Sequence, residues 1–307
     1  MNPAYSVILF TTASGAGYGL LFWLGLRTAL LRGPSGGWPD LVALTLGLAL
    51  VTVGLLSSTL HLGRPERAWR AVSQWRSSWL SREAVVAIAT YLPAGLLGLG
   101  WLMPGLLPGH RVWAVLLALG AVATVWCTGM IYACLRTVPA WNLKRVPALY
   151  LLLAAGTGGA ILCVVNAAAG RGPVPLALLS ATLLGIGLAV KLTYWSRIDS
   201  AVVRFDRAAA LGIPGATGIR PLDPPHTQPN FVMREMGYGV ARRHADRLRR
   251  VCTVLLGVAA ISLLLVALLP AAALPLAVLA VVAVAPGVFV ERWLFFAEAK
   301  HLSMLYY

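Results

Sequence analysis

Charged residues and cysteines are scarce in this sequence of 307 residues. Only 11% of the residues are Asp, Glu, Lys or Arg, while 59% are hydrophobic and the mean hydropathy is +0.79. A soluble domain of this length needs more polar surface than such a composition supplies. The four cysteines show no C-x-x-C spacing, which is typical of small apolar packing residues and argues against iron–sulfur ligation within the chain.

Histidine is also rare, and none of the five histidines lies in the middle of an apolar run. Haem ligation inside a membrane bundle needs axial ligands at similar depth on facing helices, so haem is disfavoured. The phosphate loop, the nucleophile elbow and the H-E-x-x-H zinc pattern are missing as well. We therefore expect no catalytic residue, metal, haem or iron–sulfur cluster in this chain.

What the sequence does contain is a series of long apolar runs. They cover residues 4–31, 41–60, 84–104, 112–135, 147–169, 173–196, 251–270 and 272–297. At about 1.5 Å per residue, each run is about long enough to cross a hydrocarbon core of about 30 Å. Backbone hydrogen bonds must close within each segment in lipid, which indicates helices. The sequence predicts an all-α integral membrane protein, an eight-transmembrane-helix bundle forming a single anchor domain over 1–307.

The first run has its own particular features. It has no basic segment before it and is longer than the apolar part of a signal peptide, so we expect it to be retained. The stretch "TTASGAGYGL" at 11–20 resembles a phosphate loop only superficially. Within a membrane span, its small residues predict close packing of helices.

The basic residues are distributed unevenly over the connections. The net charge is +15, and all but four of the 25 Lys and Arg residues fall on one side of the predicted bundle, with both termini. The four exceptions are Arg27, Arg32, Arg111 and Arg171. By the positive-inside rule, the side with more Lys and Arg is the cytoplasmic side of a bacterial inner membrane. The charge thus indicates topology and a membrane or partner surface, and not a nucleic-acid partner.

The most polar short connection is 61–83, "HLGRPERAWRAVSQWRSSWLSRE". Pro65 suits the first position of a helix, and at about 100° per residue the tryptophans then share one side, which predicts a cytoplasmic interfacial helix. Arg76 falls among the tryptophans, so it either snorkels or meets an anionic or polar group. Ser81 is expected to cap the third span, with Glu83 in its first turn.

His61 and Glu83 are the leading candidates for chemistry. One closes the second span and the other opens the third, so a helical hairpin brings them to similar depth. A histidine beside a carboxylate in a partly dry site can exchange protons with a lipid-borne redox group, and Arg64 could hold the carboxylate or a reduced headgroup. The alternative is that both residues only complement helix dipoles.

Other polar residues are interpreted by position. Glu291 and Arg292 lie near the hydrocarbon boundary, where an unpaired charge is costly, so a pairing partner is expected. Asn166 inside the fifth span is expected to join helices by a hydrogen bond. The long cytoplasmic segment 197–250 is Pro-rich in its middle and basic at its end, which favours docking against a protein partner over disorder.

Four sequence motifs together resemble the DmsC-type membrane anchor subunits of molybdenum oxidoreductases in the DMSO reductase family. They are "STLHLGRPERAW…SSWLSRE", "MIYACLRTVPAW", "LDPPHTQPNFVMREMGYGVARRHA" and "ERWLFFAEAKHLSMLYY", and the resemblance extends over nearly the whole chain. The opening "NPAYSVILFTTASGAGYGL" is most similar to the branch that anchors cytoplasmic sulfite dehydrogenase, the SoeC type.

The resemblance implies a heterotrimer. A catalytic subunit would carry molybdopterin and an iron–sulfur cluster, a ferredoxin-like subunit would carry four [4Fe–4S] clusters, and the anchor would exchange electrons with quinone, either ubiquinone or menaquinone. In the DMSO reductase anchor, the histidine and glutamate that match His61 and Glu83 are tied to menaquinol binding. Further quinone-site candidates, chosen here by position at the cytoplasmic end, are Arg76, Arg82, Tyr5 and Ser6.

Orientation separates the branches of the family. The DMSO reductase anchor docks its partners on the periplasmic side, whereas the charge distribution here places the loop at 61–83 in the cytoplasm. We therefore expect a sulfite:quinone dehydrogenase anchor with the iron–sulfur subunit docked on 197–250. The alternatives are a quinol-oxidising anchor of a DMSO or polysulfide reductase, a structural anchor without a quinone site, and a secondary transporter.

Overall fold

A computed structural model describes most of the chain. The described residues are 3–30, 36–60, 62–105, 109–200, 207–213, 215–220, 222–223, 228, 230, 233, 236 and 240–306. Over these residues, eight helices are long and apolar enough to cross a membrane, and no strand occurs. Their bounds are α1 Tyr5–Leu30, α2 Trp38–Thr59, α3 Trp79–Leu102, α4 His110–Ala133, α5 Arg145–Ala168, α6 Val174–Asp199, α9 Val240–Leu268 and α10 Ala273–Ala297. The eight predicted spans and the all-α class are confirmed.

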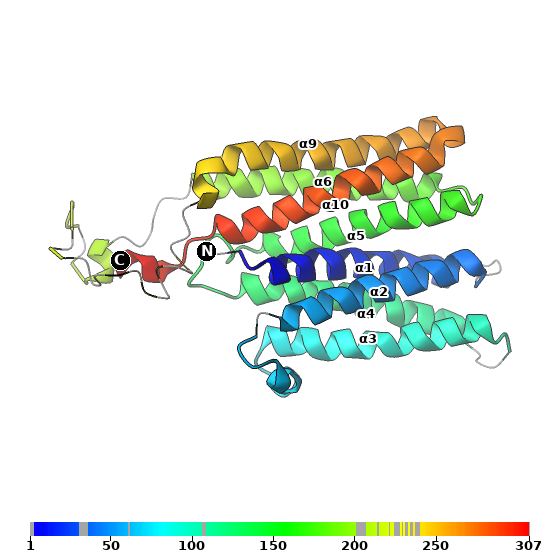
Figure 1. Cartoon of the computed structure of the whole chain (residues 1–307), viewed down its shortest axis with the longest axis horizontal. Coiled ribbons are helices and arrows are strands. Elements are labelled where there is room, and N and C mark those ends of the chain that lie inside the picture. Colours follow the sequence, from blue (N-terminus) through cyan, green and yellow to red (C-terminus); the bar gives the residue numbers. More distant parts are fainter. Residues whose placement is uncertain are drawn as a thin grey trace.

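The long helices lie side by side in one bundle (Figure 1). α1 is central, because it packs against α2, α4, α5 and α10, while α3 pairs with α4 and α9 pairs with α10. Both termini lie at one end, together with the connection between α2 and α3 (Figure 1). The short elements are the 3-10 helices η1 Pro65–Val72, η2 Pro270–Ala272 and η3 Leu302–Tyr306, and the single turn α7 Arg207–Ala210.

Glycines on α1 and α5 allow the central helices to approach closely. A Cβ atom on Gly17 would lie 2.7 Å from the Gly47 carbonyl oxygen of α2. A Cβ on Gly19 would collide with the Ala154 carbonyl of α5, and one on Gly158 would collide with the Gly19 backbone. The interpretation of the stretch at 11–20 as close helix packing is confirmed.

A buried carboxylate links the helices at the end of the bundle opposite the termini. Asp40 of α2 pairs with Arg27 of α1 and with Arg171 of the α5–α6 connection, each at 2.8 Å. Arg27 also donates a hydrogen bond to the Asn166 side chain of α5 at 3.0 Å. This confirms that Asn166 joins helices, and it shows that Arg27 and Arg171 are paired at this end.

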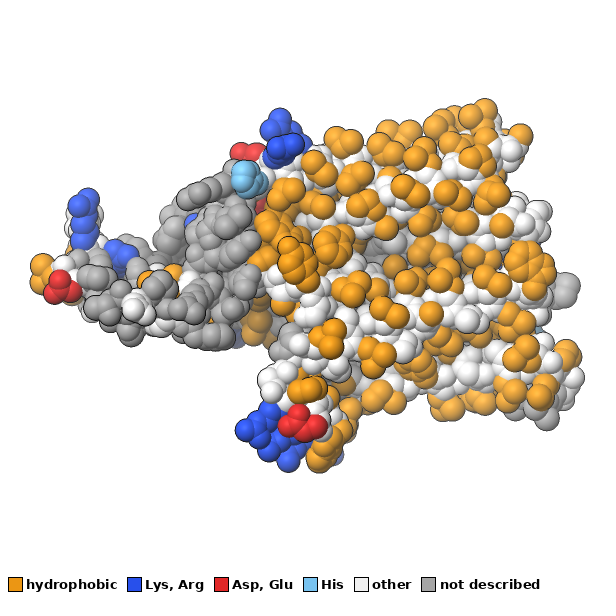
Figure 2. Space-filling view, viewed as in Figure 1, with side chains coloured by type: hydrophobic (Ala, Val, Ile, Leu, Met, Phe, Trp, Pro, Cys, Tyr) orange, Lys and Arg blue, Asp and Glu red, His pale blue; other side chains and the backbone are white. Residues whose placement is uncertain are grey.

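The outer surface has the composition of a protein in lipid. Hydrophobic side chains cover the sides of the bundle on the face shown, while Lys and Arg gather toward the end that carries the termini (Figure 2). Exposed leucine and valine side chains on α2, α3, α4 and α10 fit this environment. The chain is a multi-pass integral membrane protein.

The connection before α3 differs from the expected interfacial α-helix. A helix does begin at Pro65, but it is a 3-10 helix that ends at Val72 and is followed by turns. Ser78, with extended backbone, is the N-cap of α3, and its side chain accepts a hydrogen bond from the Ser81 amide at 3.5 Å. The prediction of Ser81 as the cap is therefore wrong, because α3 begins at Trp79, and Glu83 lies beyond its first turn.

Candidate functional site

Glu83 is a buried carboxyl in the outer part of the bundle. Its side chain belongs to α3 and is 4% exposed. The Thr128 hydroxyl of α4 donates a hydrogen bond to Glu83 Oε1. Among the described residues, no Lys, Arg or His forms an ion pair with this carboxyl. A carboxyl buried in a membrane bundle without a cation is expensive and marks a functional site by default.

The hydrogen bonds of Thr128 fit both protonation states of Glu83. Thr128 Oγ1 also lies 3.0 Å from the Thr124 carbonyl oxygen, which is a second acceptor for the same hydroxyl proton. When Glu83 is ionised, Thr128 donates to the carboxylate; when Glu83 is protonated, it can donate to Thr128, which then donates to Thr124. This arrangement suits a group that takes up and releases a proton.

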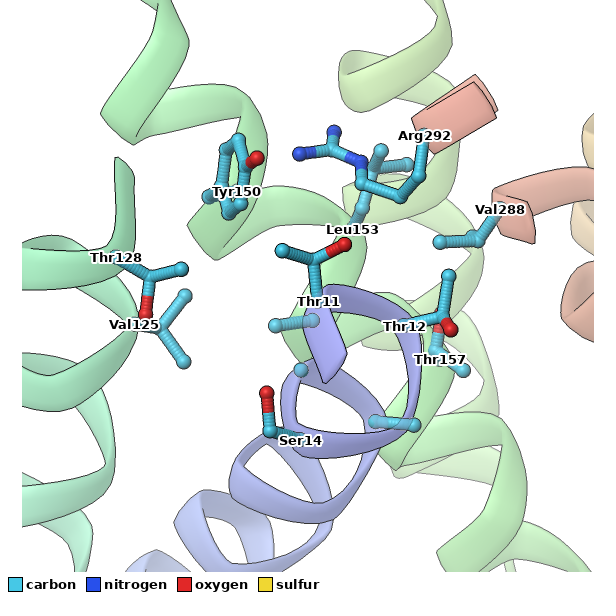
Figure 3. A pocket seen from close by; sticks show the side chains of 13 residues that line it. Thr11, Thr12, Ser14, Val125, Thr128, Tyr150, Leu153, Thr157, Val288 and Arg292 are labelled. Atoms are coloured by element: carbon cyan, nitrogen blue, oxygen red, sulfur yellow. The ribbon is translucent and has the colours of Figure 1, made fainter. Parts of the chain in front are cut away.

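A small polar cavity lies on the other side of Thr128. Its volume is about 20 Å³, and side chains of α1, α4, α5 and α10 line it (Figure 3). Thr11, Thr128, Tyr150, Thr157 and Arg292 contribute polar side chains to its wall. A space of this size holds roughly one water molecule. Thr128 therefore connects Glu83 to a polar interior space.

Several polar atoms around this cavity have unused hydrogen-bonding capacity. Among the described residues, Arg292 Nη1 and Nη2, the Tyr150 hydroxyl and Thr157 Oγ1 are buried without a hydrogen-bond partner. The guanidinium carbon of Arg292 lies 3.8 Å from the centroid of the Tyr150 ring, a cation–π contact. Buried polar groups normally have partners, so this cavity is suited to a water molecule or a polar ligand atom.

Arg292 belongs to a buried cluster of three charges. It donates from Nε to Glu291, and the other Glu291 oxygen lies 2.5 Å from Lys191 Nζ of α6. All three side chains are at most 2% exposed. The cluster holds two cations and one anion, so it leaves positive potential beside the cavity. The expectation that Glu291 and Arg292 pair is confirmed, and Lys191 is the further partner.

A second set of ion pairs lies closer to the termini. Arg249 of α9 donates to Asp199 of α6 at 2.6 and 3.0 Å and to Glu298, which follows α10, at 2.8 Å. Burial raises the pKa of the Glu298 carboxyl, although the hydrogen bond from Arg249 acts in the opposite direction. These bonds fasten α6, α9 and the end of α10 together.

The other predicted site residues do not converge on Glu83. His61 lies outside the described residues. Arg64 precedes η1 and is exposed, as is Tyr5, whose exposed fraction is 71%. The Ser6 carbonyl accepts a hydrogen bond from Ser57 at 3.1 Å. Among the described candidates, none shares a hydrogen bond or ion pair with Glu83.

Arg76 and Arg82 order the connection itself. Arg82 donates to the Trp75 and Arg76 carbonyls at 3.0 and 2.7 Å, and its guanidinium lies 4.4 Å from the Trp79 ring centroid. Arg76 is exposed, with its guanidinium 5.4 Å from the Trp75 ring centroid. Both arginines thus have a structural role in the turns before α3.

Three residues of the site were missed by sequence reasoning. Thr128 and Tyr150 are ordinary members of apolar runs, and nothing in their local sequence distinguishes them. Lys191 did carry a signal, because it is the only charged residue between Arg171 and Arg197. By sequence it falls among the basic residues of the cytoplasmic side, whereas in the structure its side chain is 0% exposed within the bundle.

The chain is similar to known proteins over its whole length. The family model for the DMSO reductase anchor subunit (DmsC) matches residues 1–297. A sulfite dehydrogenase subunit of Allochromatium vinosum is 33% identical, with 100% of this chain and 99% of that protein aligned. A component of the anaerobic dimethyl sulfoxide reductase of Escherichia coli is 32% identical over 38% of this chain and 42% of that protein. The chain belongs to the DmsC family of DMSO reductase anchor subunits.

Proposed function

We propose that this chain is the quinone-reactive anchor of a cytoplasmic sulfite:quinone dehydrogenase. In the proposed complex, a molybdopterin subunit oxidises sulfite, and an iron–sulfur subunit carries the electrons to the anchor. Both would dock at the end that carries the termini, on the cytoplasmic side of a bacterial inner membrane. The relative that is similar over its full length is a sulfite dehydrogenase subunit, whereas the similarity to the dimethyl sulfoxide reductase component covers less than half.

The observation that carries the quinone proposal is the buried Glu83 carboxyl, which has no ion-pair partner among the residues that the structure describes. A bound quinone would supply an acceptor for two electrons and two protons. The electrons come from the iron–sulfur subunit, so this chain has to manage the protons and the developing negative charge. Glu83 keeps its hydrogen bond with Thr128 whether it is protonated or ionised, so it can take up and release a proton.

Arg292 complements Glu83 in this proposal. Arg292 lines the cavity that Thr128 also lines, and its terminal guanidinium nitrogens have no hydrogen-bond partner of good geometry among the described residues. Positive charge at this position favours a reduced, anionic oxygen over a neutral carbonyl. Thr128, which is hydrogen-bonded to Glu83, and Arg292 line the same water-sized space, so proton transfer and charge stabilisation can act on a group bound there.

The test uses the assembled three-subunit complex carrying Glu83→Gln. Sulfite-dependent reduction of a short-tail quinone should fall about 10²-fold, because a group that transfers protons contributes about this much. Sulfite-dependent reduction of a soluble artificial acceptor, which takes electrons from the soluble subunits, should stay unchanged. Glu66→Gln is the matched control, since Glu66 is an exposed glutamate of η1. Unchanged quinone turnover in the assembled Glu83→Gln complex would contradict the proposal and support a structural anchor.

A further inference from the structure

A wide apolar cleft opens between α1, α2, α5 and α10. Its volume is about 620 Å³, within the range of about 300–1,000 Å³ that is usual for small-molecule sites. Leu46, Leu50, Ile161, Val281 and Phe289 are among the side chains that form its walls. Thr12 and Thr157 are its polar wall residues. The cleft therefore fits an apolar chain with a polar group at one place only.

The cleft adjoins the polar cavity. Thr12, Ala16, Thr157 and Val288 line both spaces. Figure 3 shows Thr12, Thr157 and Val288 on the side of the cavity below Arg292. Thr157 Oγ1 is buried and has no hydrogen-bond partner among the described residues. An unused hydroxyl thus lies where the apolar cleft meets the polar cavity.

The positions of the lining residues along the helices give the cleft a direction. On α5, the lining runs from Thr157 to Val165, away from the end with the termini. On α10, it runs from Val281 to Phe289, and Arg292 follows one turn later on the side of the termini. The polar end of the cleft therefore faces the termini, and its apolar part extends along the middle of the bundle.

We propose that this cleft binds the polyprenyl tail of the quinone, with the ring at the junction marked by Thr12 and Thr157. This inference rests on the proposed function and adds the route and the orientation of the substrate. A ligand with one polar head and one long apolar tail matches a space with one polar end. The small side chain of Ala285, which lines the cleft and is exposed on the outer face of α10, leaves the cleft open toward lipid.

The experiment compares quinones of different tail length in complexes held in lipid nanodiscs. Ala285→Trp would fill the cleft from its lipid side without adding bulk between buried helices. The KM for a quinone with a long polyprenyl tail should rise about tenfold, since even single methylene groups in an apolar site change specificity by this order. The KM for a quinone with one isoprene unit should stay within about twofold, because so short a tail fills far less of the cleft than a long one does.

Val282→Trp is the matched control. Val282 lies on the same helix, is 63% exposed and does not line the cleft, so both KM values should be unchanged. Equal KM values for the long-tail quinone in Ala285→Trp and in the wild type would overturn the assignment and leave a phospholipid acyl chain as the occupant. An equal loss with both quinones would also overturn it, because the obstruction would then act on the ring.

A labelling measurement tests the occupant directly. A long-tail quinone with a diazirine at the end of its tail should label α5 or α10 peptides within 157–165 or 281–289, and excess unlabelled long-tail quinone should suppress the labelling. Labelling elsewhere would contradict the cleft assignment. The short-tail assay with Glu83→Gln is independent of the cleft, so failure of the tail proposal is distinguishable from failure of the quinone proposal.

Discussion

Glu291 is the residue on which the buried charges of the bundle depend. It pairs with Lys191 of α6 and with Arg292, its neighbour on α10. Removing the shared anion by Glu291→Gln leaves two buried cations without compensation, and we expect a loss of about 3–5 kcal/mol in stability. Lys191→Met should cost less, because Glu291 keeps Arg292 as its partner. The measurement is the apparent Tm of the purified protein in detergent.

The order of the two variants is the decisive result. Glu291→Gln should unfold at a clearly lower temperature than Lys191→Met, and exposed Glu66→Gln should match the wild type. If Lys191→Met were the more damaging change, Lys191 would have to hold α6 against α10 through its contact with the Phe295 ring, at 5.7 Å, more than through Glu291.

The sequence indicates which single charged residues need a partner or mark a site, but it does not indicate which side chains surround them. The position of Glu291 near the end of an apolar run was sufficient to predict a partner, because charge in hydrocarbon is costly. Glu83 could likewise be selected by its position at the start of a span. The contact between Glu83 and Thr128 could not be predicted from the sequence. Packing between two helices decides which of many threonines faces a carboxyl, and the local sequence pattern does not show it.

At the scale of helices, the packing of α1 against α5 depends on two glycines. A methyl group on Gly19 or on Gly158 would collide with the backbone of the facing helix, which cannot move aside as a side chain can. Gly19→Ala and Gly158→Ala should each cost about 1–3 kcal/mol through overpacking. The apparent Tm and the fraction of monodisperse protein in size-exclusion chromatography should both fall.

Gly185 of α6 provides the control for these variants. A Cβ at this position has no atom within 4 Å, and the residue is exposed. Gly185→Ala should leave the Tm unchanged or raise it slightly, because alanine is the better helix former. Equal behaviour of all three variants would show that α1 and α5 separate easily, against the close approach described above.

In the connection 61–83, the helical periodicity of the sequence does not predict the observed structure correctly. An arc of tryptophans at about 100° per residue predicts an α-helix, and Pro65 did mark a helix start. The 3-10 helix instead ends at Val72, and Ser78, with an extended backbone, is the N-cap of α3. Bonds from Arg82 to the Trp75 and Arg76 carbonyls then hold the turns. Hydrogen bonds from a side chain to backbone carbonyls produce no periodic pattern in a sequence, so they could not be predicted from it.

At the scale of the whole molecule, the spans were predictable because length and hydropathy are the main requirements that lipid imposes. The observed helices begin and end within a few residues of the predicted runs, apart from α9, which starts at Val240 and includes the basic segment before the seventh run. Much of 197–250 lies outside the described residues, so its docking role stays a prediction.

The direction in which the bundle crosses the membrane remains a prediction from charge. Both termini lie at one end of the bundle (Figure 1), and the order of the spans in the sequence assigns all but four of the 25 Lys and Arg residues to that side. By the positive-inside rule this end faces the cytoplasm. An alkaline phosphatase fused after Tyr307 should therefore be inactive, and a fluorescent protein there should be bright. The same phosphatase fused after Gly105, in the connection between α3 and α4 at the opposite end, should be active. The reverse pattern at both positions would place the soluble partners in the periplasm, as expected for an anchor of an exported reductase.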